Sequence, residues 1–319
     1  MLRNIFTVSG TDLQRLGSLQ AVEFFRALLW AEARRLKIPP NHVHVSSSVN
    51  VADGGVDASV NASSLPAESG LIVTSRTCYQ IKASEAFLPQ QASHIKKELF
   101  GEKKAVFKDN LGESVRDCLD NGGAYVLVCF KQDLVDPQRR KAEGHIRKYL
   151  TECGYKNPKV EVWSQNNILG FLQPFPSLML KLSGRDHLAF QSHRSWAEQD
   201  DMRRELQAGE EQTQLIANTQ EELRRDNEAV HLHLWGEPGV GKTKLVLEAT
   251  RADDLEPLVI YCSAASFIDS DLINDLLMPD SAFSAILVID ECSAENRTLI
   301  WNRFKHAGAR IKIITIYNE

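Results

Sequence analysis

Hydrophobic residues in the first half of the chain recur first with helical and then with strand-like spacing. Across residues 11–36 they form one helical stripe, which predicts a helix that Pro39 and Pro40 end. Shorter apolar runs predict strands at residues 43–51, 56–60, 71–82, 124–130 and 159–163. Helical periodicity predicts further helices at residues 92–100, 112–119 and 137–153. This mixture predicts a first α/β domain over residues 1–185.

The last part of the chain alternates strand-like and helical runs. Strands are predicted at residues 230–235, 258–262, 285–290 and 311–317, and helices at residues 242–250, 267–278 and 294–307. Such alternation predicts a parallel sheet flanked by helices, in a second domain over residues 229–319. Residues 195–227 are dense in Glu, Gln, Arg and Asp, so we expect residues 186–228 to form a solvated helical linker.

Composition and charge agree with two domains that meet different partners. The chain has 319 residues, 43% of them hydrophobic, which is enough for two buried cores. Residues 1–190 carry 24 Lys and Arg against 19 Asp and Glu, whereas residues 191–319 carry 13 against 23. The positive N-terminal part favours a polyanionic partner such as nucleic acid. The six cysteines include no C-x-x-C pair, which is typical of reduced buried thiols.

The sequence offers no signal for export or membrane insertion. No apolar run is long and uninterrupted enough for a membrane span. Residues 1–10 lack the apolar stretch and cleavage site of a secretory signal. We therefore expect a cytoplasmic protein without membrane contact.

One motif predicts a phosphate-binding loop. The pattern G-x-x-x-x-G-K-[ST] is matched in full, between a predicted strand and a predicted helix, by Gly236, Glu237, Pro238, Gly239, Val240, Gly241, Lys242 and Thr243. Glycines let backbone N–H groups face a phosphate, Lys242 adds a positive charge, and Thr243 offers its hydroxyl to Mg²⁺. ATP with Mg²⁺ is the ligand that this loop predicts.

A second strand is predicted to complete the nucleotide site. The apolar run over residues 286–289 leads directly into Asp290 and Glu291. We expect Asp290 to hold Mg²⁺ through water and Glu291 to polarise the attacking water. Asn318 follows the next predicted strand, where it is placed either to sense the γ-phosphate or to serve as an ordinary polar strand end.

These residues resemble the STAND class of P-loop NTPases, signalling ATPases related in architecture to NACHT and NB-ARC switches. The resemblance covers residues 195–319 and rests on the loop, the strand ending in two acids and the strand order. It implies an ATP-dependent switch. The sequence after Gly236 is too short for the lid, winged-helix and sensor regions of that class, so we expect this chain to be a fragment.

A separate group of residues predicts phosphodiester hydrolysis in the first domain. Asp57 ends the turn-forming run Asp53-Gly54-Gly55-Val56-Asp57, and Gln80 and Lys82 alternate along a later strand and so share one face. Oxygen atoms of Asp57 and Gln80 suit a hard cation such as Mg²⁺. Lys82 is positioned to orient the attacking water or to offset charge that builds up on the phosphorus.

The first predicted helix offers a further acidic residue for this group. Helical projection places Glu32 beside the apolar stripe, whereas Glu23 falls on the far side. A carboxylate facing a core is costly unless it is paired or binds a metal. Glu32 is therefore the candidate, with Glu23 as the alternative and with partnership to a buried Arg as the other explanation of Glu32.

This arrangement resembles the PD-(D/E)xK restriction-endonuclease fold in its Mrr-like variant, in which Gln stands in the usual acidic position. The resemblance covers residues 10–182. It implies that Asp57, Gln80 and Lys82 form the catalytic core and that the main-chain carbonyl of Ile81 contacts the metal. Two basic groups are candidates for holding DNA phosphates: Lys96, Lys97, Lys103, Lys104 and Lys108, and Arg139, Arg140, Lys141, Arg147 and Lys148.

Together the two halves resemble prokaryotic antiviral STAND proteins, with a nuclease effector in front of a nucleotide-driven switch. The resemblance implies double-stranded DNA as substrate and a phage protein as trigger, recognised by a distal sensor outside this chain. It also implies that a homo-oligomer forms on activation. Two alternatives stay open: a restriction enzyme whose ATPase is a motor, and a non-catalytic adaptor that binds DNA or a partner.

Overall fold

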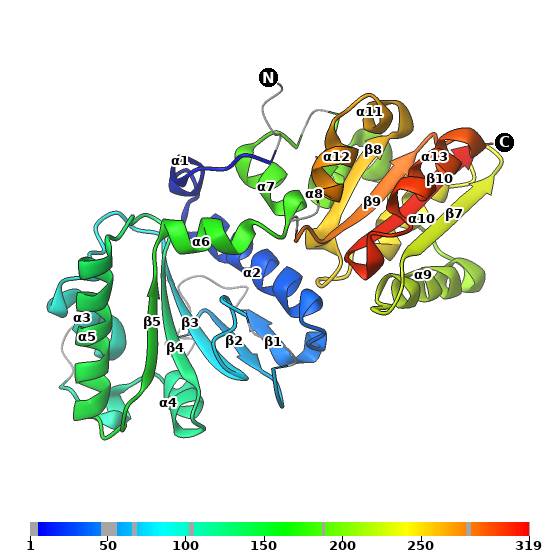
Figure 1. Cartoon of the computed structure of the whole chain (residues 1–319). Coiled ribbons are helices and arrows are strands. Elements are labelled where there is room, and N and C mark those ends of the chain that lie inside the picture. The colour runs from blue at the N-terminus through cyan, green and yellow to red at the C-terminus, as the bar shows by residue number, and fades with distance from the viewer. Residues whose placement is uncertain are drawn as a thin grey trace. The chain divides into compact units, whose positions relative to one another are not determined.

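The structure is a computed structural model that describes residues 6–45, 56–65, 69–101, 105–186, 189–278 and 282–318. The chain divides into two compact units (Figure 1). The N-terminal unit is Ser9–Phe171. The C-terminal unit begins at Leu172 and also includes the described residues 6–8. No helix in the described ranges is long and apolar enough to cross a membrane.

The N-terminal unit is an α/β structure whose strands form one five-stranded sheet. Its helices are α1 (Gly10–Gln14), α2 (Ser18–Arg35), α3 (Ala92–Phe100), α4 (Glu113–Asp120), α5 (Asp136–Glu152) and α6 (Gln165–Leu172). Its strands are β1 (Val43–Val45), β2 (Ala58–Asn61), β3 (Arg76–Lys82), β4 (Ala124–Cys129) and β5 (Lys159–Trp163). The sheet order is β1-β2-β3-β4-β5, in which β3, β4 and β5 are parallel and β2 pairs antiparallel with both β1 and β3.

Each face of this sheet is covered by its own helices. Cys78 of β3 and Leu127 of β4 belong to a core shared with residues of α3, α4 and α5. Tyr79, which points the other way, contacts Phe25 of α2 at 5.2 Å between ring centroids. Figure 1 shows the same layering, with α3 and α5 on one face and α2 on the other. Side chains at even positions of β3 therefore face α3, and those at odd positions face α2.

The C-terminal unit contains the second five-stranded sheet. Its helices are α7 (Pro176–Ser183), α8 (His193–Ala197), α9 (Glu210–Leu223), α10 (Lys242–Ala249), α11 (Ala264–Ile268), α12 (Leu272–Leu277) and α13 (Ala294–Phe304). Its strands are β6 (Gln191–Ser192), β7 (Val230–Gly236), β8 (Val259–Ser263), β9 (Ala285–Asp290) and β10 (Ile311–Asn318). The mixed α/β class with parallel strands, predicted from the alternating pattern, is confirmed.

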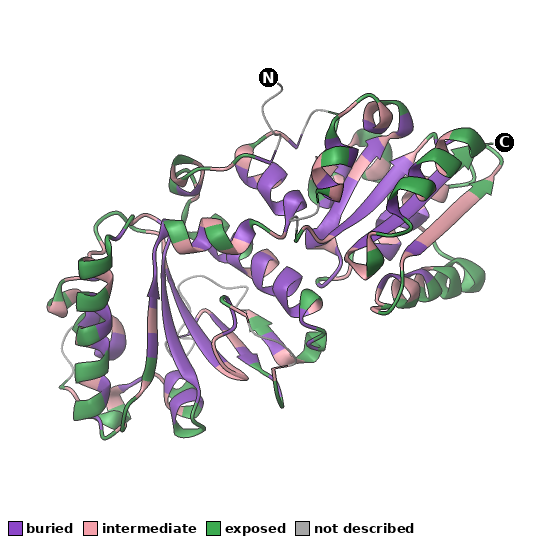
Figure 2. Cartoon of the chain, in the orientation of Figure 1, coloured by how far each residue is buried: buried purple, intermediate pink, exposed green. Residues whose placement is uncertain are grey.

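The strand order of the second sheet brings the chemistry to one edge. The order is β6-β8-β9-β10-β7, in which β8, β9, β10 and β7 are parallel and β6 pairs antiparallel with β8. Because the carboxyl ends of parallel strands meet at one edge, the residues at the carboxyl ends of β7, β9 and β10 lie near one another. Strand β7 is less buried than β8 and β9, as Figure 2 also shows.

The structure divides some of the predicted elements. The helix expected over residues 11–36 is two helices, α1 and α2, because the chain leaves the helical conformation between Gln14 and Ser18. Of the strand expected at residues 71–82, only β3 is extended in the sheet. The run at residues 43–51 gives β1, and its remainder from residue 46 lies outside the described ranges.

The boundary between the units also lies earlier than residue 185. Helix α7 packs in the C-terminal unit, where the Ser177 hydroxyl donates to the carbonyl oxygen of Val259 at 2.7 Å. The segment expected to be a solvated linker contributes β6 and α8, and Trp196 of α8 is completely buried. Helix α9 is mostly exposed, as its polar composition predicts. All six cysteines of the chain are buried and free, four in the N-terminal unit and two in the C-terminal unit.

Candidate nucleotide and nuclease sites

The phosphate-binding motif forms a loop between β7 and α10. Strand β7 ends at Gly236 and α10 begins at Lys242. Gly236, Gly239 and Gly241 have φ values of 149°, 81° and 86°, a region that residues with side chains rarely adopt. An added Cβ meets nothing within 4 Å at any of the three, so the backbone conformation rather than crowding requires glycine. The exposed residues of the loop are Glu237, Pro238, Gly239, Val240 and Gly241.

The lysine of the motif lies over its own loop. The Lys242 ammonium donates to the carbonyl oxygens of Gly236 at 2.8 Å and of Glu237 at 2.7 Å. These neutral acceptors are the kind that a phosphate oxygen outcompetes, because hydrogen bonds to a charged group are stronger. The ammonium is therefore already held at the mouth of the loop, where a bound phosphate would exchange with the two carbonyls.

Asp290, the last residue of β9, contacts both the first turn of α10 and the neighbouring strand β8. The Thr243 hydroxyl donates to Asp290 Oδ2 at 3.0 Å, and the Tyr261 hydroxyl of β8 donates to the same oxygen at 3.1 Å. The backbone N–H of Glu291 donates to Asp290 Oδ1 at 2.8 Å. A carboxylate beside a threonine hydroxyl is an oxygen donor set that suits Mg²⁺. Sequence reasoning selected Thr243 and Asp290 but not Tyr261.

Glu291 and Asn318 complete this edge of the sheet. Glu291 is exposed and has a φ of 54°, an uncommon conformation for a residue other than glycine. Such strained positions cluster at functional sites. Asn318 is exposed and lies opposite Gly236 in the pairing of β10 with β7, at the first residue of the loop. The predicted nucleotide-site residues therefore converge on one edge.

The candidate nuclease residues meet where β2 begins. Asp57 Oδ2 accepts from the Gln80 side-chain amide at 2.8 Å and from the backbone N–H of Ile81 at 2.6 Å. Lys82 follows Gln80 by two positions on β3, so both side chains lie on the face towards α3. The structure thus brings Asp57, Gln80 and Lys82 together on one side of the sheet.

Main-chain geometry bears on the role expected of Ile81. The Lys82 carbonyl accepts from the N–H of Phe130 at 2.8 Å, so the backbone groups of Lys82 point towards β4. Because backbone groups of successive strand residues point to alternate sides, those of Ile81 point towards β2 and Asp57. Oxygens of Asp57 and Ile81 therefore suit a hard cation. The Gln80 side-chain oxygen joins them if the amide turns, because its nitrogen now contacts Asp57. In the described part of the chain, no three His, Cys, Asp or Glu side chains cluster as a metal site.

Glu98 of α3 is a neighbour that sequence reasoning missed. Its carboxylate forms an ion pair of 2.7 Å with the Lys82 ammonium, and the two side chains are only 18% and 24% exposed. The Lys82 ammonium also lies 5.8 Å from the centre of the Phe87 ring. Glu98 lies between buried residues of an amphipathic helix, the same signal that drew attention to Glu32.

Glu32 is not brought to this group. Its buried carboxylate accepts two hydrogen bonds from Arg35, at 2.6 and 2.7 Å, and one from the Ser69 hydroxyl at 2.5 Å. Helix α2 covers the face of the sheet that carries Tyr79, opposite to Gln80 and Lys82. The structure therefore agrees with the explanation that Glu32 pairs with an arginine. Glu23 of α2 is exposed.

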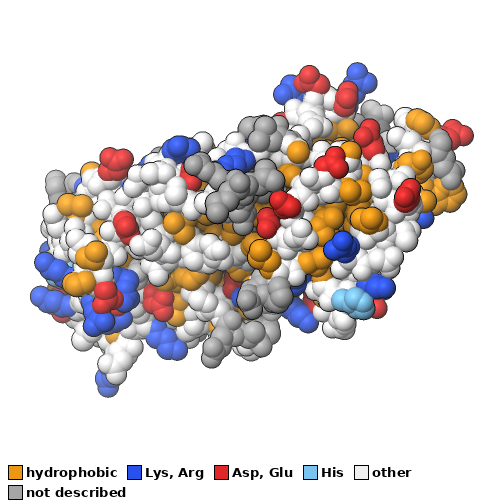
Figure 3. All heavy atoms as spheres, turned by 45° about the horizontal axis from the view of Figure 1, so that its top comes forward, with side chains coloured by type: hydrophobic (Ala, Val, Ile, Leu, Met, Phe, Trp, Pro, Cys, Tyr) orange, Lys and Arg blue, Asp and Glu red, His pale blue; other side chains and the backbone are white. Residues whose placement is uncertain are grey.

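The basic residues expected to hold DNA are partly neutralised within the unit. On α5, Arg139 and Arg147 pair with Glu143, and Arg140 pairs with Asp136. In Figure 3, Lys and Arg side chains gather at the end of the view that belongs to the N-terminal unit, with Asp and Glu among them. The residues Asp53, Gly54, Gly55, Lys103 and Lys104 lie outside the described ranges.

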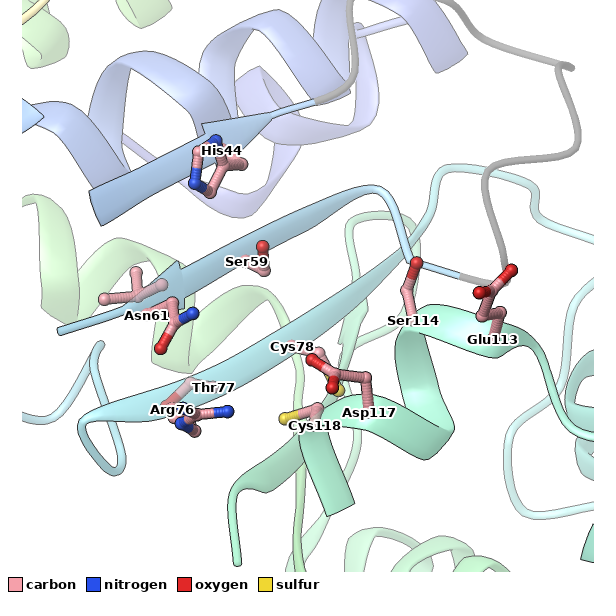
Figure 4. A pocket seen from close by; sticks show the side chains of 11 residues that line it. His44, Ser59, Asn61, Arg76, Thr77, Cys78, Glu113, Ser114, Asp117 and Cys118 are labelled. Atoms are coloured by element: carbon pink, nitrogen blue, oxygen red, sulfur yellow. The ribbon is translucent and has the colours of Figure 1, made fainter. Parts of the chain in front are cut away.

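A pocket of about 360 Å³ lies at the opposite end of β3 from Lys82. Its lining is mainly polar and includes His44, Ser59, Arg76 and Asp117 (Figure 4). Cys118 also contributes to the lining. None of the residues predicted for catalysis lines this pocket, so it is separate from the group around Asp57.

Comparisons with known proteins leave the family open. No protein-family model matches the sequence, and no curated protein does. Among solved structures, the structure of C. elegans PCH-2 is similar to part of the chain, with 14% sequence identity and a TM-score of 0.26. The match covers 36% of this chain and 38% of that chain. A likeness this weak carries no argument about fold or activity.

Proposed function

We propose that the C-terminal unit binds ATP with Mg²⁺ and hydrolyses it. The observation that carries the proposal is the contact between the Thr243 hydroxyl and Asp290, made by a loop whose glycines adopt positive φ values. This is the arrangement that a phosphate-binding loop and its acidic partner strand need to hold a cation between them. It joins residues that are 47 positions apart.

Each residue has a separate task in this proposal. Backbone N–H groups of the loop and the first turn of α10 face the phosphates, and Lys242 adds a positive charge. Mg²⁺, when bound, neutralises developing phosphate charge, and Thr243 and Asp290 are the residues that would hold it. Glu291 orients the attacking water, and Asn318 lies close enough to the loop to contact the terminal phosphate.

The test is ATP binding by calorimetry and phosphate release. Lys242→Ala is expected to weaken ATP binding by roughly tenfold or more, because a charge-assisted contact is lost. Lys244→Ala is the matched control, since Lys244 lies on the same helix but pairs with Glu248. Glu291→Gln is expected to retain binding and lose phosphate release. Equal ATP affinity in the parent and in Lys242→Ala would contradict the proposal.

A second function is favoured in the N-terminal unit, namely Mg²⁺-dependent cleavage of double-stranded DNA. Its support is the placement of Asp57, Gln80 and Lys82 on one face of the sheet. In this proposal Asp57, Gln80 and the Ile81 carbonyl hold the cation. Lys82 orients the attacking water once its ion pair with Glu98 opens.

Nicking of supercoiled plasmid DNA with Mg²⁺ tests this second function. Asp57→Asn and Lys82→Ala are each expected to reduce nicking by at least about a hundredfold. Lys159→Ala is the control, because Lys159 is exposed at the start of β5 and belongs to neither basic group. If Lys82→Ala nicks as well as the parent, the unit is not a nuclease of this kind, and the adaptor explanation gains support.

The regulation that joins the two units is part of the same proposal. The resemblance to antiviral STAND proteins supports a nuclease that is silent until a phage protein is sensed and the chain assembles into a homo-oligomer. Sedimentation with Mg²⁺ and ATP, compared with ADP, measures assembly, and the nicking rate of each species measures activation. Equal nicking by monomer and oligomer would contradict this regulation. ATP hydrolysis that depends on movement along DNA would favour the motor alternative.

A further inference from the structure

Tyr261 is an unassigned residue at the nucleotide site. It lies on β8, and its hydroxyl donates to Asp290 Oδ2 at 3.1 Å, the oxygen that also accepts from Thr243. Together with the N–H of Glu291 on Oδ1, three donors hold this carboxylate. Tyr261 differs from the other two because it belongs to neither of the motifs that predicted the site.

The ring of Tyr261 has little freedom to turn away. It is stacked on Trp196 with 4.4 Å between ring centroids and 7° between ring planes. Trp196 is completely buried, and its neighbour His193 shares a hydrogen bond of 2.9 Å with the carbonyl oxygen of Leu247 on α10. Gln191 of β6 is paired with Tyr261 itself. The stack is therefore anchored to both β8 and the helix that follows the phosphate-binding loop.

The Tyr261 hydroxyl is thus fixed beside the Asp290 carboxylate, to which it donates a hydrogen bond. A donor fixed in this way stabilises one orientation of the carboxylate.

We propose that Tyr261 is a positioning residue that sets the orientation of Asp290 and thereby the contribution of the divalent cation to nucleotide affinity. The inference rests on the proposed binding of ATP with Mg²⁺. It assigns a task to the segment around Trp196, which holds the tyrosine ring in place. Tyr261 acts through Asp290 and needs no contact with the nucleotide.

The experiment compares ATP affinity in EDTA and in Mg²⁺ for the full chain, by isothermal titration calorimetry. Tyr261→Phe removes the hydroxyl and keeps the aromatic stack. We expect its affinity in EDTA to stay within about twofold of the parent, while the gain in affinity caused by Mg²⁺ falls by about tenfold. Tyr79→Phe is the matched control: it removes a buried hydroxyl that donates to Leu71 in the other unit, and both affinities should stay unchanged.

The other outcomes separate this inference from the function on which it rests. Equal weakening in EDTA and in Mg²⁺ would mean that Tyr261 only supports the fold, and an unchanged gain with Mg²⁺ would mean that its hydroxyl has no effect on the cation. Either result overturns the inference and leaves ATP binding intact. A parent chain that binds no ATP under either condition would overturn both. Thermal melts without ligand establish that the variant is folded.

Discussion

Replacing Trp196 with alanine is expected to destabilise the C-terminal unit and leave the N-terminal unit unaffected. Trp196 is completely buried and stacked on Tyr261, so its loss leaves a cavity inside the unit. Removing a buried tryptophan ring costs about 3–5 kcal/mol of unfolding free energy. Its indole N–H finds no acceptor among the described residues, and such an unsatisfied donor already costs about 1–3 kcal/mol. Because the second cost is relieved when the indole is removed, we expect a net loss of about 2 kcal/mol.

Hydrogen exchange at increasing urea concentration, measured by mass spectrometry, resolves the two units. Peptides from β8 and β10 report on the C-terminal unit, and peptides from β4 report on the N-terminal unit. Trp163→Ala is the matched variant, because Trp163 is a buried tryptophan of the N-terminal unit that contacts Tyr79. It should have the reverse effect on the two sets of peptides.

A milder substitution separates packing from the orphaned N–H. Trp196→Phe keeps a ring in the stack and removes the unsatisfied donor, so its stability should stay within about 1 kcal/mol of the parent. If Trp196→Ala left the protection of β8 unchanged, residues 191–197 would not be part of the C-terminal core. If it lowered the protection of β4 equally, the two units would not unfold separately. Either result would refute the reasoning.

Three further predictions concern single residues. Glu98→Gln removes the charge partner of Lys82 and should lower the unfolding free energy of the N-terminal unit by about 1 kcal/mol in urea titrations; a variant as stable as the parent would contradict this. Burial lowers the pKa of His231 to about 4, so the unfolded chain takes up a proton that the folded chain does not as the pH falls from about 6.5 to 4. The unfolding free energy should fall over that window, and partial exposure of the ring limits the loss to about 1–2 kcal/mol. Thermal melts measure this, and the same pH profile in His231→Gln would contradict this cause. Gly239→Ala should cost about 1–2 kcal/mol because of its φ of 81°, whereas Gly144→Ala, within helix α5 and with open space for a Cβ, should add about 0.5–1 kcal/mol; melting shifts of the same sign would contradict the argument.

Local patterns in the sequence predicted the loop between β7 and α10 better than they predicted which helix acid lies near Asp57. The glycine spacing of the phosphate-binding loop reflects backbone conformations that involve only neighbouring residues. The position of Asp290 and Glu291 at the end of β9 is predicted by the apolar run that precedes them. Tyr261 escaped notice because its contact with Asp290 depends on which strands become neighbours in the sheet. That neighbourhood is a property of the three-dimensional arrangement, which no short segment records.

The helix acid shows a different limit of sequence reasoning. Glu32 and Glu98 both lie among apolar residues of amphipathic helices, so helical periodicity gives them equal standing. Only the packing of α2 and α3 on opposite faces of the sheet separates them. The domain boundary was displaced for a related reason. Residues 176–183 are apolar enough for either core, and their composition does not say which one they join.

The buried thiols in both units allow the opening of each unit to be followed by chemical labelling. Cys78 and Cys129 are inaccessible in one unit, and Cys262 and Cys292 in the other. A bulky alkylating reagent reacts with them only when the surrounding structure separates, at a rate set by that local event. Mass analysis of the alkylated peptides would then time the opening of each half in a single sample, without an added label or an engineered reporter.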